Sequence, residues 1–221
     1  MNYPYGLLAE HWHWGATLLY ALALIMTLFK APWYKLKPGH LTHVYLGSCV
    51  SLLLLWSIKS DAIPGLEYHY LGAMLLTLMF GWQLAFIALS IVLIGLVING
   101  SSDWQTYPLN ALLLGLFPTL LSHTIHRLVE RYLPQHFFIY IFANAFFGAA
   151  LVLLGTIMLT TLILLTGEIY NWQKLTQLYL SFIPLMIFPE AFITGFLITV
   201  MVVMRPGWVL SFDDRRYLIG K

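Results

Sequence analysis

Residues 70–98 read YLGAMLLTLMFGWQLAFIALSIVLIGLVI, a run of 29 residues without Asp, Glu, Lys or Arg. A helix that crosses a bilayer needs about 20 apolar residues, so this run is long for one membrane span. At its centre Gly81 is flexible and Gln83 is costly to expose to lipid, which predicts a break at Gly81-Trp82-Gln83. The break decides the fold, because the chain has six membrane spans without it and seven with it.

The composition of the whole chain agrees with a membrane protein. Of its 221 residues, 60% are apolar and 9% are charged, and the mean hydropathy is +0.81. Soluble domains carry about 25% charged residues, so this composition excludes a cytosolic enzyme and a disordered chain. A net charge of +2 is too weak and too dispersed for binding nucleic acid. We expect a single transmembrane domain over residues 1–221.

Five further apolar runs predict the remaining spans. They cover residues 14–29, 41–58, 107–125, 137–166 and 178–204. With seven spans, nine Lys and Arg side chains fall on the cytoplasmic side and two fall outside, as the positive-inside rule requires. We therefore predict an all-α, multi-pass protein of the inner or cytoplasmic membrane, with seven transmembrane helices, the N-terminus outside and the C-terminus in the cytoplasm. The third span, residues 65–80, is short, so spans three and four should form a short, tilted helical hairpin.

Histidines at the predicted membrane surfaces suggest metal sites, since imidazole binds most transition metals. Outside, His11 and His13 either capture a metal or are ordinary interfacial side chains. At the cytoplasmic face, two pairs with i,i+3 spacing could meet as a four-histidine metal site or bind haem. They are His40 with His43 and His123 with His126. Interfacial histidines without a function are the alternative.

Two polar residues within the predicted spans are candidates for a supporting network. Glu190 lies deep in the last span, where a carboxylate is expensive and usually faces the bundle interior. Asn110 lies at the outer end of the fifth span and either bonds to an outward-facing site or begins a helix. Cys49 is the single cysteine, which leaves no disulfide framework.

Several motifs, in order along the chain, resemble the cobalt/nickel-uptake substrate-binding membrane component (CbiM/NikM type) of energy-coupling-factor transporters. The motifs are Met1-Asn2-Tyr3-Pro4-Tyr5-Gly6, His69-Tyr70-Leu71-Gly72-Ala73, Phe80-Gly81-Trp82, Pro108-Leu109-Asn110, Glu190-Ala191 and Arg205-Pro206. The resemblance covers the whole chain and implies the same seven-span fold.

The resemblance also implies a metal site at the chain's beginning. The family binds its metal with the N-terminal amine, the backbone nitrogen and imidazole of the second residue, and the histidine of the third-helix motif. Carried over, Met1 and His69 are retained, whereas Asn2 replaces the second-position histidine and Tyr5 replaces an acidic residue. An amide oxygen is a poor ligand for Ni(II) or Co(II), so His11 or His13 could substitute and shift the preference towards copper or zinc. The N-terminus must thread into the bundle, and residues 1–14 contain no Lys or Arg that would indicate a secretory signal, so we expect Met1 to be the natural start.

The leading hypothesis is substrate capture for transition-metal uptake rather than an enzyme. The chain contains no nucleotide-binding Gly-x-x-x-x-Gly-Lys-Ser/Thr motif, so ATP-driven transport would need a coupling membrane subunit and ATPase subunits beside the lipid bilayer. No organic cofactor is expected. Two alternatives stay open: a non-transporting membrane assembly or metal-handling factor on the same scaffold, and a haem-binding membrane protein that uses His43 and His123.

Overall fold

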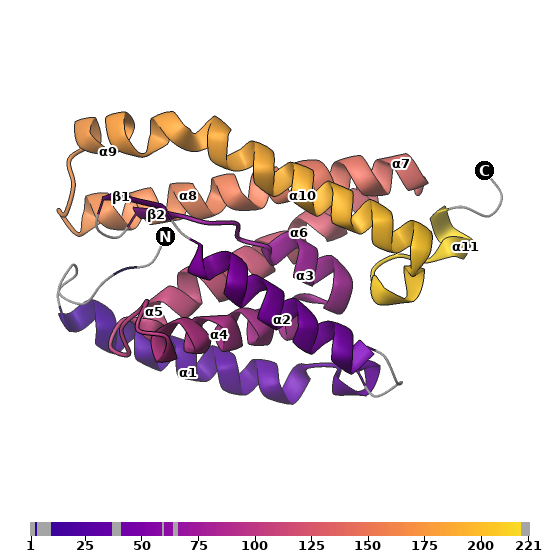
Figure 1. Cartoon of the computed structure of the whole chain (residues 1–221), viewed down its shortest axis with the longest axis horizontal. Coiled ribbons are helices and arrows are strands. Elements are labelled where there is room, and N and C mark those ends of the chain that lie inside the picture. The colour runs from indigo at the N-terminus through magenta and orange to yellow at the C-terminus, as the bar shows by residue number, and fades with distance from the viewer. Residues whose placement is uncertain (1–2, 4–9, 37–40, 59, 64–65, 218–221) are drawn as a thin grey trace.

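Long helices lie side by side in a bundle and end at two opposite faces of the molecule (Figure 1). This computed structural model describes residues 3, 10–36, 41–58, 60–63 and 66–217, with the side chains of residues 11 and 60–68 left out. The elements in chain order are α1 (Glu10–Lys30), η1 (Trp33–Lys35), α2 (Leu41–Ser57), β1 (Ser60–Ile63), β2 (Leu66–Tyr68), α3 (Ala73–Phe80), α4 (Trp82–Ile98), α5 (Tyr107–Ala111), η2 (Leu112–Leu116), α6 (Phe117–Tyr132), α7 (Phe137–Ile139), η3 (Tyr140–Phe147), α8 (Gly148–Thr166), α9 (Trp172–Leu178), η4 (Leu180–Phe182), α10 (Ile183–Met204), η5 (Pro206–Trp208) and α11 (Asp214–Tyr217).

The break predicted at Gly81 is confirmed. Gly81 has φ +86° and separates α3 from α4. Gly72, just before α3, lies against Leu52 of α2, and Gly95, near the end of α4, lies against the adjacent Leu53. Two glycines so far apart in sequence can touch neighbouring residues of one helix only if the chain turns back between them. The run 70–98 is therefore an antiparallel hairpin.

The first half of this hairpin differs from the prediction. A helix from residue 65 was expected, but β1 and β2 form an antiparallel pair in which Ser60 lies opposite Tyr68, and residues 69–72 are not helical. The all-α prediction therefore missed a short β-hairpin. Helix α3 begins only at Ala73 because Gly72 has φ +72°, a left-handed conformation that an α-helix cannot contain. The remaining predicted spans all contain helices at the expected positions.

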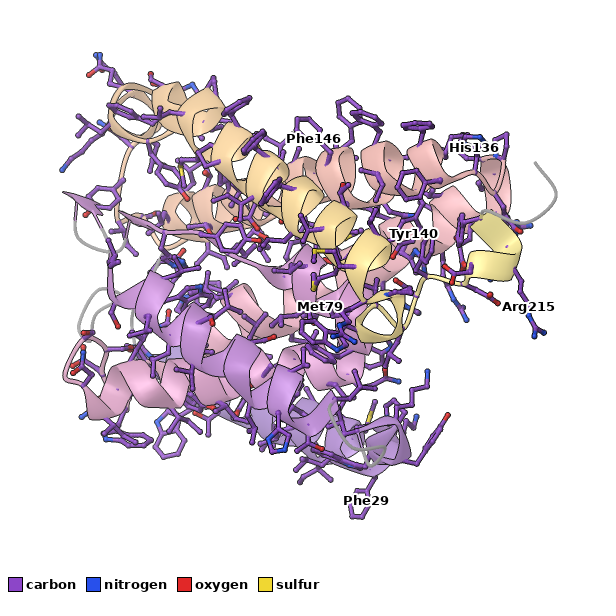
Figure 2. All side chains as sticks on the ribbon, turned by 45° about the vertical axis from the view of Figure 1, so that its right-hand side comes forward. Phe29, Met79, His136, Tyr140, Phe146 and Arg215 are labelled. Atoms are coloured by element: carbon purple, nitrogen blue, oxygen red, sulfur yellow. The ribbon has the colours of Figure 1, made fainter. Side chains whose placement is uncertain are left out.

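Four helical stretches among the described residues are long and apolar enough to cross a membrane. They are Trp12–Lys30, Tyr107–Tyr132, Phe137–Thr166 and Trp172–Met204, and two shorter apolar helices, α2 and α4, accompany them. The second and third stretches contain the π-helical turns η2 and η3, which add a residue to a turn without ending the helix. Large apolar side chains point outward from the bundle, as Phe29 does with 87% of its surface exposed (Figure 2). Such a surface suits a lipid environment.

Basic side chains gather at one end of the bundle. This end holds η1, α7, η5 and α11 on the right of Figure 1, and Figure 2 shows Arg215 and His136 there. Of the Lys and Arg residues that the structure describes, all but Lys174 belong to elements that end or lie at this face. The described part of the chain therefore has the charge asymmetry that the positive-inside rule associates with a cytoplasmic face.

The substitution Gly72→Ala should destabilise the protein more than Gly100→Ala. Both glycines have positive φ, +72° and +74°, but a Cβ at Gly72 would lie 2.7 Å from Leu52 Cδ2, whereas Gly100 has open space. We expect a loss of about 1 kcal/mol from the left-handed backbone at Gly100 and a further 1–3 kcal/mol or so from the clash at Gly72. Thermal unfolding in detergent measures both. Equal unfolding midpoints for the two variants would contradict the close packing of Gly72 on α2.

Candidate metal-binding site

Glu190 holds the non-helical segment that leads into α3. Its carboxylate accepts hydrogen bonds from the backbone N–H of Leu71, at 2.7 Å, and of Gly72, at 2.8 Å. Glu190 lies on α10, directly after Pro189, and only 2% of its surface is exposed. The N–H groups at the beginning of a helix have no acceptor within that helix, and inside a membrane there is no water to accept their hydrogen bonds. The buried carboxylate supplies the missing hydrogen-bond partners of these two N–H groups.

His69 lies at the start of this segment, next to the end of α2. Its ring packs against Trp56 with a centroid separation of 4.4 Å, and its Nδ1 is 3.2 Å from the carbonyl oxygen of Tyr70. Trp56 is 1% exposed and its indole Nε1–H has no hydrogen-bond partner among the described residues. The hydroxyl of Tyr70 pairs with Thr194 of α10 at 2.8 Å. The Trp56 ring on one side and the fixed segment on the other restrict the position of the imidazole.

Asn110 holds the backbone of Tyr3 inside the bundle. Its Oδ1 accepts from the Tyr3 N–H at 2.9 Å, and its Nδ2 donates to the Tyr3 carbonyl at 3.3 Å. The Tyr3 hydroxyl donates to the carbonyl of Thr160 in α8 at 3.3 Å. Tyr3 is 2% exposed and Asn110 is fully buried. Residue 3 is therefore enclosed by α5 and α8.

The structure places only part of the predicted ligand set. Met1 and Asn2 lie outside the described residues, and for His11 only the backbone in α1 is described. His13 is half-buried on α1, where its carbonyl accepts a hydrogen bond from Thr17 at 2.7 Å. In the described part of the chain, no three His, Cys, Asp or Glu side chains come together as a metal-binding group.

The predicted second site at the basic end is also only partly described, because His40 lies outside the described residues. His126 pairs with Asn144 Oδ1 at 3.2 Å, and its Nε2 is 3.7 Å from Glu130. The ring of His123 lies 6.3 Å from that of Trp82 instead. The i,i+3 spacing thus directs these imidazoles to different neighbours, and the described histidines do not form a shared metal site.

Glu130 instead joins α6 to the C-terminal helix α11. Its Oε1 accepts from the Arg216 guanidinium at 3.1 Å. Burial raises the pKa of the nearby Tyr217 phenol to about 12, and the Glu130 carboxylate acts in the same direction. Tyr217 therefore stays neutral at physiological pH and stacks on Phe212 at 5.1 Å. These contacts give His126 and Glu130 a structural role.

Comparison with known proteins decides the family. The family model for the cobalt uptake substrate-specific transmembrane region, CbiM, matches residues 2–208. The chain belongs to this family. The CbiM match covers all the elements described above up to η5. A comparison with curated proteins found none that matches the chain.

Two solved structures share the CbiM fold of this chain. A truncated transition metal transporter superposes with a TM-score of 0.73 at 18% identity, covering 92% of this chain and 99% of its own. A second structure, of a transition metal transporter, gives the same TM-score and identity and covers 91% of this chain and 92% of its own. At this identity the likeness extends to the fold.

Sequence reasoning missed Tyr3 and Trp56. Tyr3 was quoted only as part of the opening motif, and no sequence signal shows that its backbone would meet Asn110 107 positions away. Trp56 stands at the end of an apolar run, where a tryptophan is usually a membrane-interface side chain. Its contact with His69 depends on the β-hairpin between them, which was not predicted.

The substitution Glu190→Gln should destabilise the protein by about 1–3 kcal/mol. Glutamine keeps the shape but has one acceptor oxygen, so either Leu71 or Gly72 loses the partner of its N–H. The matched control is Glu168→Gln, because Glu168 is exposed in the turn after α8. Thermal unfolding in detergent should show a lower midpoint for the Glu190 variant only. A midpoint equal to that of the wild type would disprove the structural role of this carboxylate.

Proposed function

We propose that the chain captures a transition-metal ion outside the membrane and passes it inward, as the substrate-specific component of an uptake transporter. Membership of the CbiM family supports this function. The observation that carries it is the pair of clamps, Asn110 on the backbone of Tyr3 and Glu190 on the segment that follows His69. Both hold parts of the chain that would supply ligands rather than parts that simply fill the core.

The proposed ligands are the amine of Met1, Asn2 and His69. Two residues extend at most about 7 Å, so a chain that starts at Met1 keeps its amine within that distance of the buried Tyr3. Amine, backbone nitrogen and imidazole donors suit borderline metal ions such as Ni(II), Co(II), Cu(II) and Zn(II). In this proposal the metal is the transported substrate, and Asn110 and Glu190 fix the ligands without touching it.

The identity of the metal depends on Asn2, because this residue changes the proposed ligand set. A side-chain amide replaces the imidazole that the family resemblance assigns to position 2, which removes a strong nitrogen donor. We propose that His11 or His13, both on the first turns of α1, supplies the missing imidazole. A nickel- or cobalt-like substrate fits the family, and copper or zinc fits the altered ligand set.

The proposed topology has seven spans, with the beginning of the chain outside and the end in the cytoplasm of the inner or cytoplasmic membrane. Two observations support it: the reversal at Gly81 and the gathering of described basic side chains at the end that holds α11. The sequence has no nucleotide-binding loop, so we propose that a coupling membrane subunit and ATPase subunits supply the energy.

Purified protein with a free N-terminus should retain metal, and His69→Ala should lose most of it. The control is His136→Ala, since His136 lies at the opposite end and stacks on Phe138. We expect the affinity of the His69 variant to fall at least about tenfold. Elemental analysis and a metal titration measure this. An N-terminal tag, which consumes the amine, should act like His69→Ala; equal metal content in all four proteins would refute the site.

The substitution Asn2→His should strengthen nickel or cobalt binding. It restores the imidazole that the family resemblance places at position 2, beside the amine and the backbone nitrogen. Titration with Ni(II), Co(II), Cu(II) and Zn(II) should show a gain of about tenfold or more for the first two. An unchanged order of affinities would mean that position 2 does not face the metal.

A further inference from the structure

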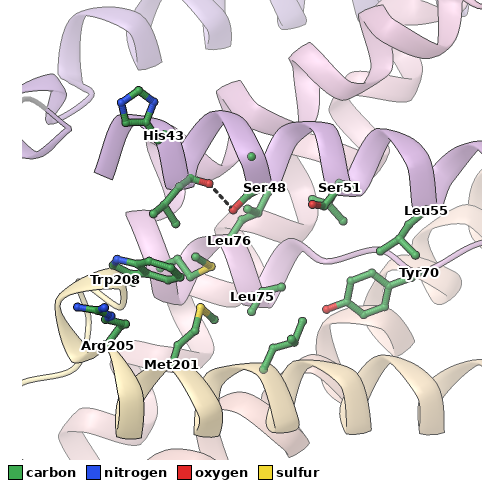
Figure 3. A pocket seen from close by; sticks show the side chains of 15 residues that line it. His43, Ser48, Ser51, Leu55, Tyr70, Leu75, Leu76, Met201, Arg205 and Trp208 are labelled. Carbon is green, nitrogen blue, oxygen red and sulfur yellow. Dashed lines mark hydrogen bonds between the residues drawn. The ribbon is translucent and has the colours of Figure 1, made fainter. Parts of the chain in front are cut away.

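A groove runs between α2 and α10 on the outside of the bundle (Figure 3). Its volume is about 700 Å³, which lies in the range of sites for small molecules. Leu75 and Leu76 of α3 form its floor, Met79 and Met201 line it, and Tyr70 closes one end. The described residues leave this space unfilled by protein.

Two of the polar groups in the wall of the groove are already bonded within the protein. Ser48 Oγ donates to the carbonyl of Val44 at 2.8 Å, and the Tyr70 hydroxyl pairs with Thr194 at 2.8 Å. Ser51 and Gly47 are small, so the α2 wall is recessed rather than filled. Between its ends the groove therefore offers a guest a mainly apolar surface.

The length of the groove matches one leaflet of a bilayer. Its lining runs along α2 from His43 to Leu55, roughly 18 Å at the helical rise, and along α10 from Leu197 to Arg205, roughly 12 Å. One leaflet is about 15 Å deep, half of a hydrocarbon core of about 30 Å. A partner helix that crosses the membrane needs the full depth, so the groove fits an acyl chain better than a helix.

Charge is confined to one end of the groove. Arg205 and Trp208 lie there together, opposite Tyr70 (Figure 3). Arg205 is exposed and forms no ion pair with an acidic side chain among the described residues. Tryptophan and arginine at a helix end are typical of the headgroup region, and basic pockets between transmembrane helices bind anionic headgroups. The end that holds Arg205 is also the basic end of the bundle.

We propose that this groove binds an anionic phospholipid of the bilayer. One acyl chain lies between α2 and α10, over Leu75 and Leu76, and the phosphate meets the Arg205 guanidinium at the level of Trp208. The lipid fills the gap between α2 and α10. The groove shares no residue with the proposed metal ligands, and its charged end lies opposite Tyr70, the neighbour of His69.

The test is native mass spectrometry of the full chain in detergent, titrated with phosphatidylglycerol and with phosphatidylcholine of the same acyl chains. We expect about fivefold tighter binding of phosphatidylglycerol, the contribution of one basic side chain near a membrane surface. Arg205→Gln should abolish this preference and Arg205→Lys should keep it. Arg131→Gln is the control, because Arg131 lies over the Tyr132 ring instead of the groove. Equal binding of both lipids by the wild type, or no effect of Arg205→Gln, overturns the proposal.

A second pair of variants tests the apolar part of the groove. Ser51→Phe fills it and should weaken both lipids, whereas Ser57→Phe changes an exposed serine of the same helix that lies outside the groove and should have no effect. Unchanged lipid binding by Ser51→Phe overturns the proposal. If this variant instead loses a bound membrane subunit while its lipid binding is unchanged, the groove is a protein interface and the lipid proposal is wrong. If Ser51→Phe does not fold, the Arg205 series alone decides.

Discussion

A pair of hydrogen bonds that two backbone amides donate to a buried carboxylate fixes the non-helical segment at the centre of this molecule. Glu190 accepts from Leu71 and Gly72 inside a bundle that its composition places in lipid. Without such a partner, non-helical backbone at that depth would carry unsatisfied donors, each costing several kcal/mol. The carboxylate thus permits a helix to start in the middle of the bundle. Both the short α3 and the location of His69 follow from it.

The beginning of the chain uses the same principle with a neutral side chain. Asn110 offers one acceptor and one donor to Tyr3, the same pair of bonds that a neighbouring strand would form. A helix pairs its own backbone donors and acceptors, whereas a non-helical segment inside the bundle needs side chains as hydrogen-bond partners. The two polar residues that stood out within the predicted spans are these partners. Their cost in a membrane is offset because each replaces two missing backbone bonds.

The sequence predicts the helices well and the extended segments poorly. Apolar runs and the flexible Gly81 show where helices lie, because burial in lipid dictates both length and composition. Residues 70–72 belong to the same uncharged run as α3 and therefore look like part of its helix. Gly72 nevertheless adopts a left-handed conformation, which depends on its neighbours in three dimensions. Glu190 could be selected as a candidate from its cost in the membrane, whereas the sequence left Asn110 with two possible roles. Their partners could not be selected, since Leu71 and Tyr3 contribute backbone atoms, which every residue has.

The non-helical segment before α3 also has a mechanical consequence. The hydrogen bonds that Leu71 and Gly72 donate to Glu190 tie this segment to α10. A displacement of α10 against α2 would be carried through Glu190 to residues 71 and 72 and on to His69, while Trp56 stays with α2. The position of the segment beside His69 is therefore coupled to that of α10, a helix that runs from one face of the bundle towards the other.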